Sequence, residues 1–292
     1  MGGVAWALIS AVALGTNSIV VAVTARRIGV LLTTGVSIVI AFLLLIAYAL
    51  VMQLRFVLDG GDWVLLALLA AAAAVAFLAS YRSLQLGPLA VVSPISASNG
   101  LMTVLFAFAF VGERPTMLQW CGIPVAAAGS VLASVRAEGN SRLSLVGAGP
   151  LFAALGVASG AISNAGLRIP IRHVGAVQTI LVQRAFTVLY VWAVLLLIFR
   201  RGRAGGHPQR PKLKLSPHNA ALLGVVGLLD AFSFLTFAKG LAVSPAWLVG
   251  ILSQSGRVIA VLGGIVLFRE HLRGYQWFGI GLLAVGLALS VL

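Results

Sequence analysis

The chain has 292 residues, of which 61% are hydrophobic and only 9% are charged, whereas soluble domains carry about 25% charged residues. Together with a mean hydropathy of +1.09 and apolar runs along the whole length, this composition excludes a soluble enzyme with a single anchor helix. The single cysteine, Cys121, excludes an intramolecular disulfide. The net charge of +14 is spread between the apolar runs, which indicates topology signals instead of a nucleic-acid surface.

The apolar runs are separated by charged residues, prolines and glycines, and they predict an all-α membrane protein with ten transmembrane helices. The expected spans are residues 4–24, 31–54, 63–86, 88–111, 116–135, 146–167, 175–199, 219–241, 245–268 and 274–292. We expect this protein in the cell membrane of a bacterium, crossing the bilayer many times.

The two halves of the chain repeat one another. A shift of 157 positions pairs Pro88 with Pro245, Glu113 with Glu270, and Gln119-Trp120 with Gln276-Trp277, and a shift of 146 in the first two spans pairs Arg26 with Arg172 and Gly29 with Gly175. Each unit has five spans, an odd number, so the second unit enters the membrane in the opposite orientation. We therefore expect two inverted five-helix repeats, residues 1–136 and 146–292, an architecture of secondary transporters whose site lies at the midplane.

Two blocks of sequence identify the repeat more closely. The segment 111–115 with Gln119-Trp120 resembles the end of an EamA repeat in the drug/metabolite transporter superfamily, and the segment 268–272 with Gln276-Trp277 repeats it with Arg269 in place of glycine. The stretch 81–94 and the polar break at 15–17 are also similar. The resemblance implies ten helices, a central cavity lined by both halves, and transport of small metabolites, often amino acids. The superfamily also includes sugar-phosphate and nucleotide-sugar carriers.

Three charged residues fall inside predicted spans at similar depth: Arg184, Asp230 and Arg257. Intramembrane charges are costly and need a cavity or a partner. Their counterparts in the first repeat are the uncharged residues Ile38, Ala73 and Gly100. One interpretation is a buried Arg–Asp pair that fixes helix register. The other is a binding site, in which the surplus arginine recognises the carboxylate or phosphate of an anionic or zwitterionic substrate.

Neutral polar residues form a second set of candidates. Asn17 in the first span corresponds in depth to Ser163 and Asn164 in the sixth, and Ser253 lies in the ninth. Such residues either line a cavity or provide close packing and interhelical hydrogen bonds. The predicted substrate-binding set is therefore Asn17, Ser163, Asn164, Arg184, Asp230, Ser253 and Arg257.

Glu113 and Glu270 each end an apolar run. A carboxylate there can cap the N-terminus of the following helix, so we expect a structural cap, with gating as the alternative. Asp230 is the better candidate for proton coupling, because it lies near the middle of a span.

Catalytic, metal and cofactor chemistry finds no support in the sequence. The four histidines fall in predicted loops without ligand spacing, and the chain has no phosphate-binding Gly-Lys-Ser/Thr loop. We therefore expect no enzyme activity, no cofactor, no metal and no nucleic acid. The expected partners are the lipid bilayer and a small-molecule substrate, with the protein a monomer or homodimer.

Thirteen Lys and Arg residues lie in the odd-numbered connections and five in the even-numbered ones. By the positive-inside rule, the odd connections and the basic segment 200–217 face the cytoplasm, and both termini face outward. The family resemblance implies the opposite orientation of the termini.

We conclude from the sequence that this is a carrier, with export expected, that moves small polar metabolites such as amino acids by alternating access. A divalent-cation transporter is the alternative within transport, although one central carboxylate is too few for a cation site. A scaffold without transport activity, or a membrane enzyme, is the alternative outside it.

Overall fold

The computed structural model describes residues 2–86, 95–96, 98–114, 116–134, 148–204, 216–256, 259 and 273–291, and every regular element in these ranges is helical. The helices are α1 (Gly3–Ile28), α2 (Val30–Val51), α3 (Gly60–Leu86), α5 (Asn99–Phe106), α6 (Met117–Ser134), α7 (Ala148–Gly166), α8 (Arg168–Val174), α9 (Ala176–Ala204), α10 (Pro217–Val243), α11 (Ala246–Gln254) and α13 (Gly274–Val291), with the π-helical η1 (Ala107–Val111) continuing α5.

Six of the described segments are long and apolar enough to cross a membrane: Gly3–Ala25, Leu31–Val51, Gly60–Ser80, Ala148–Val174, Ala176–Leu197 and Pro217–Val243. They correspond to six of the ten expected spans. The fourth and ninth expected spans lie partly outside the described residues. The sixth span differs from expectation because α7 is followed, after Leu167 alone, by α8, so the apolar segment extends to Val174.

A glycine with positive φ separates the first two helices of each repeat. Gly29 joins α1 to α2 with φ +94°, and Gly175 joins α8 to α9 with φ +104°. Residues with a Cβ rarely adopt this conformation, so the matched pair identified in the sequence forms the same turn twice.

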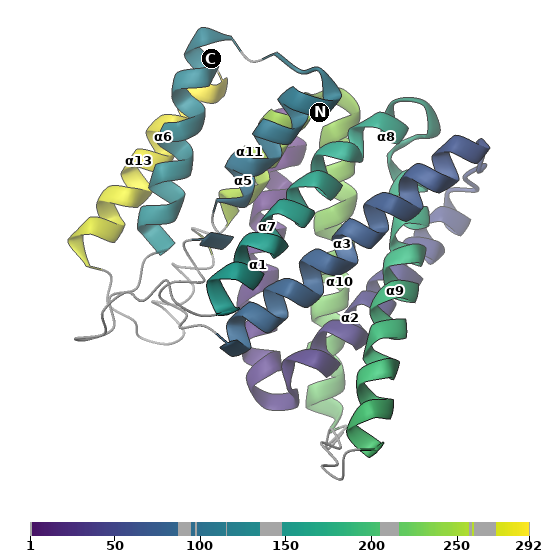
Figure 1. The fold of residues 1–292 in the computed structure, drawn as a ribbon. Coiled ribbons are helices and arrows are strands. Elements are labelled where there is room, and N and C mark those ends of the chain that lie inside the picture. Colours follow the sequence, from purple (N-terminus) through teal and green to yellow (C-terminus); the bar gives the residue numbers. More distant parts are fainter. Residues whose placement is uncertain are drawn as a thin grey trace.

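The main helix contacts join one half of the chain to the other (Figure 1). α1 packs along α10 and α3 along α7, while α2 contacts α10 and α3 contacts α9. Under the repeat correspondence, in which α1, α2, α3 and α6 match α7, α9, α10 and α13, each contact maps onto its counterpart. Reciprocity of this kind is the signature of a two-fold relation.

The last helices of the two repeats, α6 and α13, pack side by side at one edge of the molecule (Figure 1). A Cβ atom added at Gly129 would lie 2.7 Å from the carbonyl oxygen of Gly279, and one added at Gly286 would lie 2.8 Å from that of Gly122. These are the same contact seen from the two repeats. Small residues let membrane helices approach this closely, and packing then replaces the hydrophobic effect as the stabilising term.

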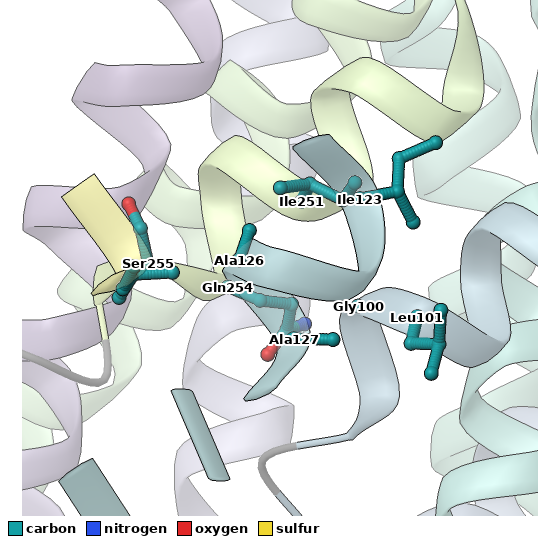
Figure 2. Close-up of a pocket in the computed structure, with 9 residues that line it drawn as sticks. Gly100, Leu101, Ile123, Ala126, Ala127, Ile251, Gln254 and Ser255 are labelled. Carbon is teal, nitrogen blue, oxygen red and sulfur yellow. The ribbon is translucent and has the colours of Figure 1, made fainter. Parts of the chain in front are cut away.

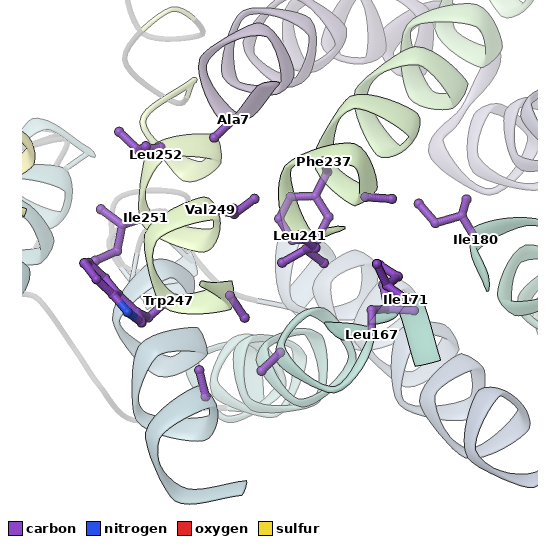
Figure 3. Close-up of a cluster of buried hydrophobic side chains, with 14 of the residues drawn as sticks. Ala7, Leu167, Ile171, Ile180, Phe237, Leu241, Trp247, Val249, Ile251 and Leu252 are labelled. Atoms are coloured by element: carbon purple, nitrogen blue, oxygen red, sulfur yellow. The ribbon is translucent and has the colours of Figure 1, made fainter. Parts of the chain in front are cut away.

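The largest buried apolar cluster extends through helices of both repeats, and Figure 3 shows part of it, with residues of α1, α8, α9, α10 and α11. Phe237 and Leu241 of α10 belong to it, as do Trp247 and Val249 of α11. Because elements of both repeats contribute, this core fixes the relative position of the halves. Many large apolar side chains elsewhere are exposed, including Leu43, Leu68 and Leu189, as expected for surfaces that face lipid. The chain is a multi-pass membrane protein.

Candidate functional site

Two of the three intramembrane charges lie together between α9 and α10. Arg184 Nη2 is 3.1 Å from Asp230 Oδ2, and the arginine is only 1% exposed. The guanidinium carbon lies 3.8 Å from the ring centre of Phe234 and 5.9 Å from that of Phe77. These two phenylalanines are 157 positions apart and therefore equivalent in the repeat. Arg184 is thus placed at the interface between the repeats.

The ion pair leaves donor capacity on the arginine. Nη2 of Arg184 faces the Asp230 carboxylate at 3.1 Å, whereas its Nε is buried and has no hydrogen-bond partner among the described residues. A buried guanidinium with unused donors is able to bind a carboxylate or phosphate through two parallel hydrogen bonds.

The neutral candidates are spread around this pair. Ser163 of α7 is buried and accepts a hydrogen bond of 2.9 Å from Gln183, the residue next to Arg184. Gln183 was not singled out in the sequence. The only sequence feature that could have identified Gln183 is its position next to Arg184.

The other neutral candidates do not meet the Arg184–Asp230 pair through any recorded contact among the described residues. Asn17 of α1 has a buried Oδ1 without a hydrogen-bond partner in the described ranges. Ser253 of α11 is buried and donates to the Ala7 carbonyl at 3.5 Å, a packing contact between α11 and α1. Asn164 is half-buried. Arg257 lies outside the described residues.

Glu113 caps a helix, but the expectation that it caps the following helix is wrong. Its Oε1 and Oε2 accept hydrogen bonds of 2.8 and 3.1 Å from the backbone N–H groups of Ala246 and Trp247, the first residues of α11 in the other repeat. Arg168 Nε also lies 2.7 Å from Oε1. The carboxylate therefore connects the segment after η1 to two sites of the second repeat, the N-terminus of α11 and Arg168 at the start of α8.

The helix after Glu113 has its own cap. At the start of α6, Thr116 N donates to Gln119 Oε1 at 2.9 Å and Gln119 N donates to Thr116 Oγ1 at 3.4 Å. This reciprocal pair satisfies the helix N-terminus, which leaves Glu113 available for α11. Glu270 lies outside the described residues.

Two further polar contacts were not expected. His173 Nε2 of α8 lies 2.7 Å from Asp62 Oδ1 of α3, a hydrogen bond between the repeats. Lys239 lies inside α10, within the expected span 219–241, where Nζ is 4.9 Å from the ring centre of Trp6 and 3.4 Å from Tyr48 Oη. His173 and His218 also lie in helices and not in loops. No group of three or more metal-ligating side chains occurs in the described part of the chain.

A small cavity lies between α5, α6, α11 and α13 (Figure 2). It has a volume of about 20 Å³ and is lined by Gly100, Ala126, Ile251 and Gln254 among others, which is enough for about one water molecule. Neither Arg184 nor Asp230 lines it. The charged pair therefore lies outside this cavity, with Arg184 buried and the Asp230 side chain 15% exposed.

Comparisons with known proteins agree with the sequence and the fold. A bacterial protein from Sinorhizobium sp, described as an uncharacterized transporter in the cobO 3' region, is 35% identical over 78 residues, which are 27% of this chain and 55% of that protein. The chain thus spans about half the length of this curated relative. A solved crystal structure with 20% sequence identity superposes with a TM-score of 0.75 over 96% of both chains; at this identity the likeness shows the fold alone.

The family comparison covers both halves of the chain. The model of the EamA-like transporter family matches residues 1–135 and again residues 147–292, which confirms the resemblance seen in the paired glutamate blocks and gives the protein a two-repeat architecture. The chain therefore belongs to the EamA-like transporter family.

Proposed function

We propose that this protein is a secondary transporter that moves a small metabolite bearing a carboxylate or phosphate group, such as an amino acid or a related anion, and that it acts as an exporter. Arg184 is the proposed recognition residue and Asp230 its counter-ion. The observation that carries this proposal is the buried guanidinium at the interface between the repeats, whose Nε has no hydrogen-bond partner among the described residues while its Nη2 pairs with Asp230.

We propose further that the full fold has ten membrane-spanning helices in two inverted repeats. The reciprocal contacts of α1 with α10, α3 with α7 and α6 with α13 support a two-fold relation between the repeats. Inverted repeats place the substrate site between them near the midplane, where alternating access exposes it to each side in turn. Arg184 lies between equivalent rings of the two repeats, which fits that location.

The direct test is ligand-induced thermal stabilisation of the purified protein by amino acids, organic anions, sugar phosphates and divalent cations. We expect an anion to stabilise the wild type, and Arg184→Gln to weaken its binding by at least about tenfold, because hydrogen bonds to charged groups contribute about 1.5–3 kcal/mol. Arg184→Lys retains the charge but loses the paired donors, so it binds more weakly than the wild type. Arg172→Gln, on an exposed arginine of α8, is the matched control.

Removing one partner of a buried ion pair also destabilises a protein, by about 3–5 kcal/mol. The double variant Arg184→Gln/Asp230→Asn removes both charges and separates binding from folding. We expect it to be more stable than Arg184→Gln and still unable to bind the anion. Efflux of the bound anion from preloaded proteoliposomes, measured with and without the same anion outside, then tests transport. Binding that is unchanged in the double variant would contradict the proposed site, and stabilisation by a divalent cation alone would favour the cation alternative.

A further inference from the structure

The two repeats adopt different conformations in this structure. α9 packs against α10, whereas the equivalent helices α2 and α3 have almost no contact within the described ranges. Likewise, α8 contacts α10 in the second repeat. The second repeat is therefore closed between its second and third helices, and the first repeat is open there. In a carrier built from inverted repeats, the opposite access state is reached when the repeats exchange conformations.

The Arg184–Asp230 ion pair lies at the contact that this exchange would break. Arg184 is on α9, and both Asp230 and Phe234 are on α10, one helical turn apart. The equivalent positions on α3 are Ala73 and Phe77. The guanidinium therefore has an equivalent phenylalanine on each repeat, but a carboxylate only on the second repeat.

We infer that Arg184, Asp230 and the uncharged Ala73 form a one-sided charge switch that makes this carrier exchange one anion for another. When α9 separates from α10 and α2 closes on α3, the guanidinium moves from Phe234 and Asp230 towards Phe77 and Ala73. It then has no carboxylate partner on that side. The anionic group of a bound substrate supplies the missing charge, so the loaded carrier changes state readily and the empty carrier does not.

The electrostatics give the expected size of the effect. An unpaired charge inside a membrane protein is disfavoured, and insertion scales correspond to a bias of roughly 70- to 400-fold between paired and unpaired states. Without substrate, the wild type is therefore expected to occupy the present conformation almost completely. A ligand shifts this equilibrium only by binding the second state more tightly, which is the contribution of the anion. This part of the inference rests on the proposed anion site.

The test is to exchange the charge between the repeats. The variant Ala73→Asp/Asp230→Ala keeps the composition of the site and moves the carboxylate to α3. Spin labels at Leu189 and Val225 report the α9–α10 distance, and labels at the equivalent positions Leu43 and Leu68 report the α2–α3 distance, on a Cys121→Ser background. All four side chains are exposed, so the labels do not disturb packing, and the two pairs form matched probes.

In the ligand-free wild type, we expect the α9–α10 pair to be shorter than the α2–α3 pair. In the exchanged variant we expect the α9–α10 pair to become longer than in the wild type, because the carboxylate that ties α10 to Arg184 has been removed, with a change of at least about tenfold in the ratio of the two states. Ala73→Asp alone retains the native pair and adds the second, and it should populate both distances. Distances that stay as in the wild type in both variants would overturn the switch.

Addition of L-glutamate, L-malate or inorganic phosphate separates this inference from the proposed function. If any of these anions increases the population of the wild type in which α2 is close to α3, the result supports both the charge switch and the proposed anion site. A longer α9–α10 distance in the ligand-free exchanged variant, without a response of the wild type to any of the three, supports the charge switch and contradicts the proposed anion specificity.

Discussion

Gly286→Leu is expected to prevent stable packing of α13 on α6 and to lower the free energy of unfolding by about 3 kcal/mol or more. A side chain at this position would meet the backbone of the facing helix, including the Gly122 carbonyl oxygen at 2.8 Å from the new Cβ. Backbone atoms cannot yield as a flexible side chain does, so the helices must separate, and overpacking already costs 1–3 kcal/mol where neighbours can adjust. Thermal unfolding in detergent measures the loss.

The matched control is Gly281→Leu on the same helix. A Cβ atom there would have no neighbour within 4 Å, and leucine favours the helix more than glycine does, so this variant should be as stable as the wild type or slightly more stable. Gly129→Leu should cause a loss like that of Gly286→Leu, since it meets the Gly279 carbonyl oxygen at 2.7 Å. Equal stability of the Gly286 and Gly281 variants would contradict the close crossing.

Glu113→Ala is expected to lower the free energy of unfolding by about 3–5 kcal/mol, the range for breaking a buried ion pair. The substitution removes the acceptor for two backbone N–H groups at the start of α11 and leaves Arg168 without the carboxylate that lies 2.7 Å from its Nε. Because Glu113 belongs to one repeat and its partners to the other, we expect the substitution to weaken the packing between the repeats. Thermal unfolding of the purified variant measures it.

Two comparison variants define the cause. Glu113→Gln keeps one oxygen acceptor for the α11 N-terminus but loses the charge, so we expect a smaller loss than for alanine. Arg114→Ala changes the exposed neighbouring residue and should stay within about 0.5 kcal/mol of the wild type, as surface substitutions do. A similar stability of Glu113→Ala and Arg114→Ala would show that the carboxylate does not hold the repeats together.

The repeat was the most informative feature of the sequence. It paired Gly29 with Gly175, both of which have positive φ in the structure, and it identified Ala73 and Phe77 as the counterparts of Asp230 and Phe234. Intramembrane charges were also visible, because charge is rare in apolar spans. Similar depth was enough to suggest that Arg184 and Asp230 could meet, and they lie 3.1 Å apart.

What could not be predicted depends on contacts between elements far apart in the chain. Glu113 was expected to cap the helix that follows it because caps are usually local, whereas its partners Ala246 and Trp247 lie in the other repeat. The sequence also did not show which neighbouring helix each polar side chain faces. Ser253 turns to the α1 backbone, and periodicity in a span that is apolar all round does not select a face.

The packing of α6 against α13 also determines the order in which the native contacts can form during biosynthesis. Gly286 is made 157 residues after Gly129, and at about 5–20 residues per second this interval lasts roughly 10–30 seconds. During that time α13, the helix that packs against Gly129 of α6, has not yet been synthesised. In the same way, α1 is synthesised before its partner α10, and α3 before its partner α7. The first repeat is therefore inserted before its partners exist, and its native packing can be completed only after the second repeat has been synthesised.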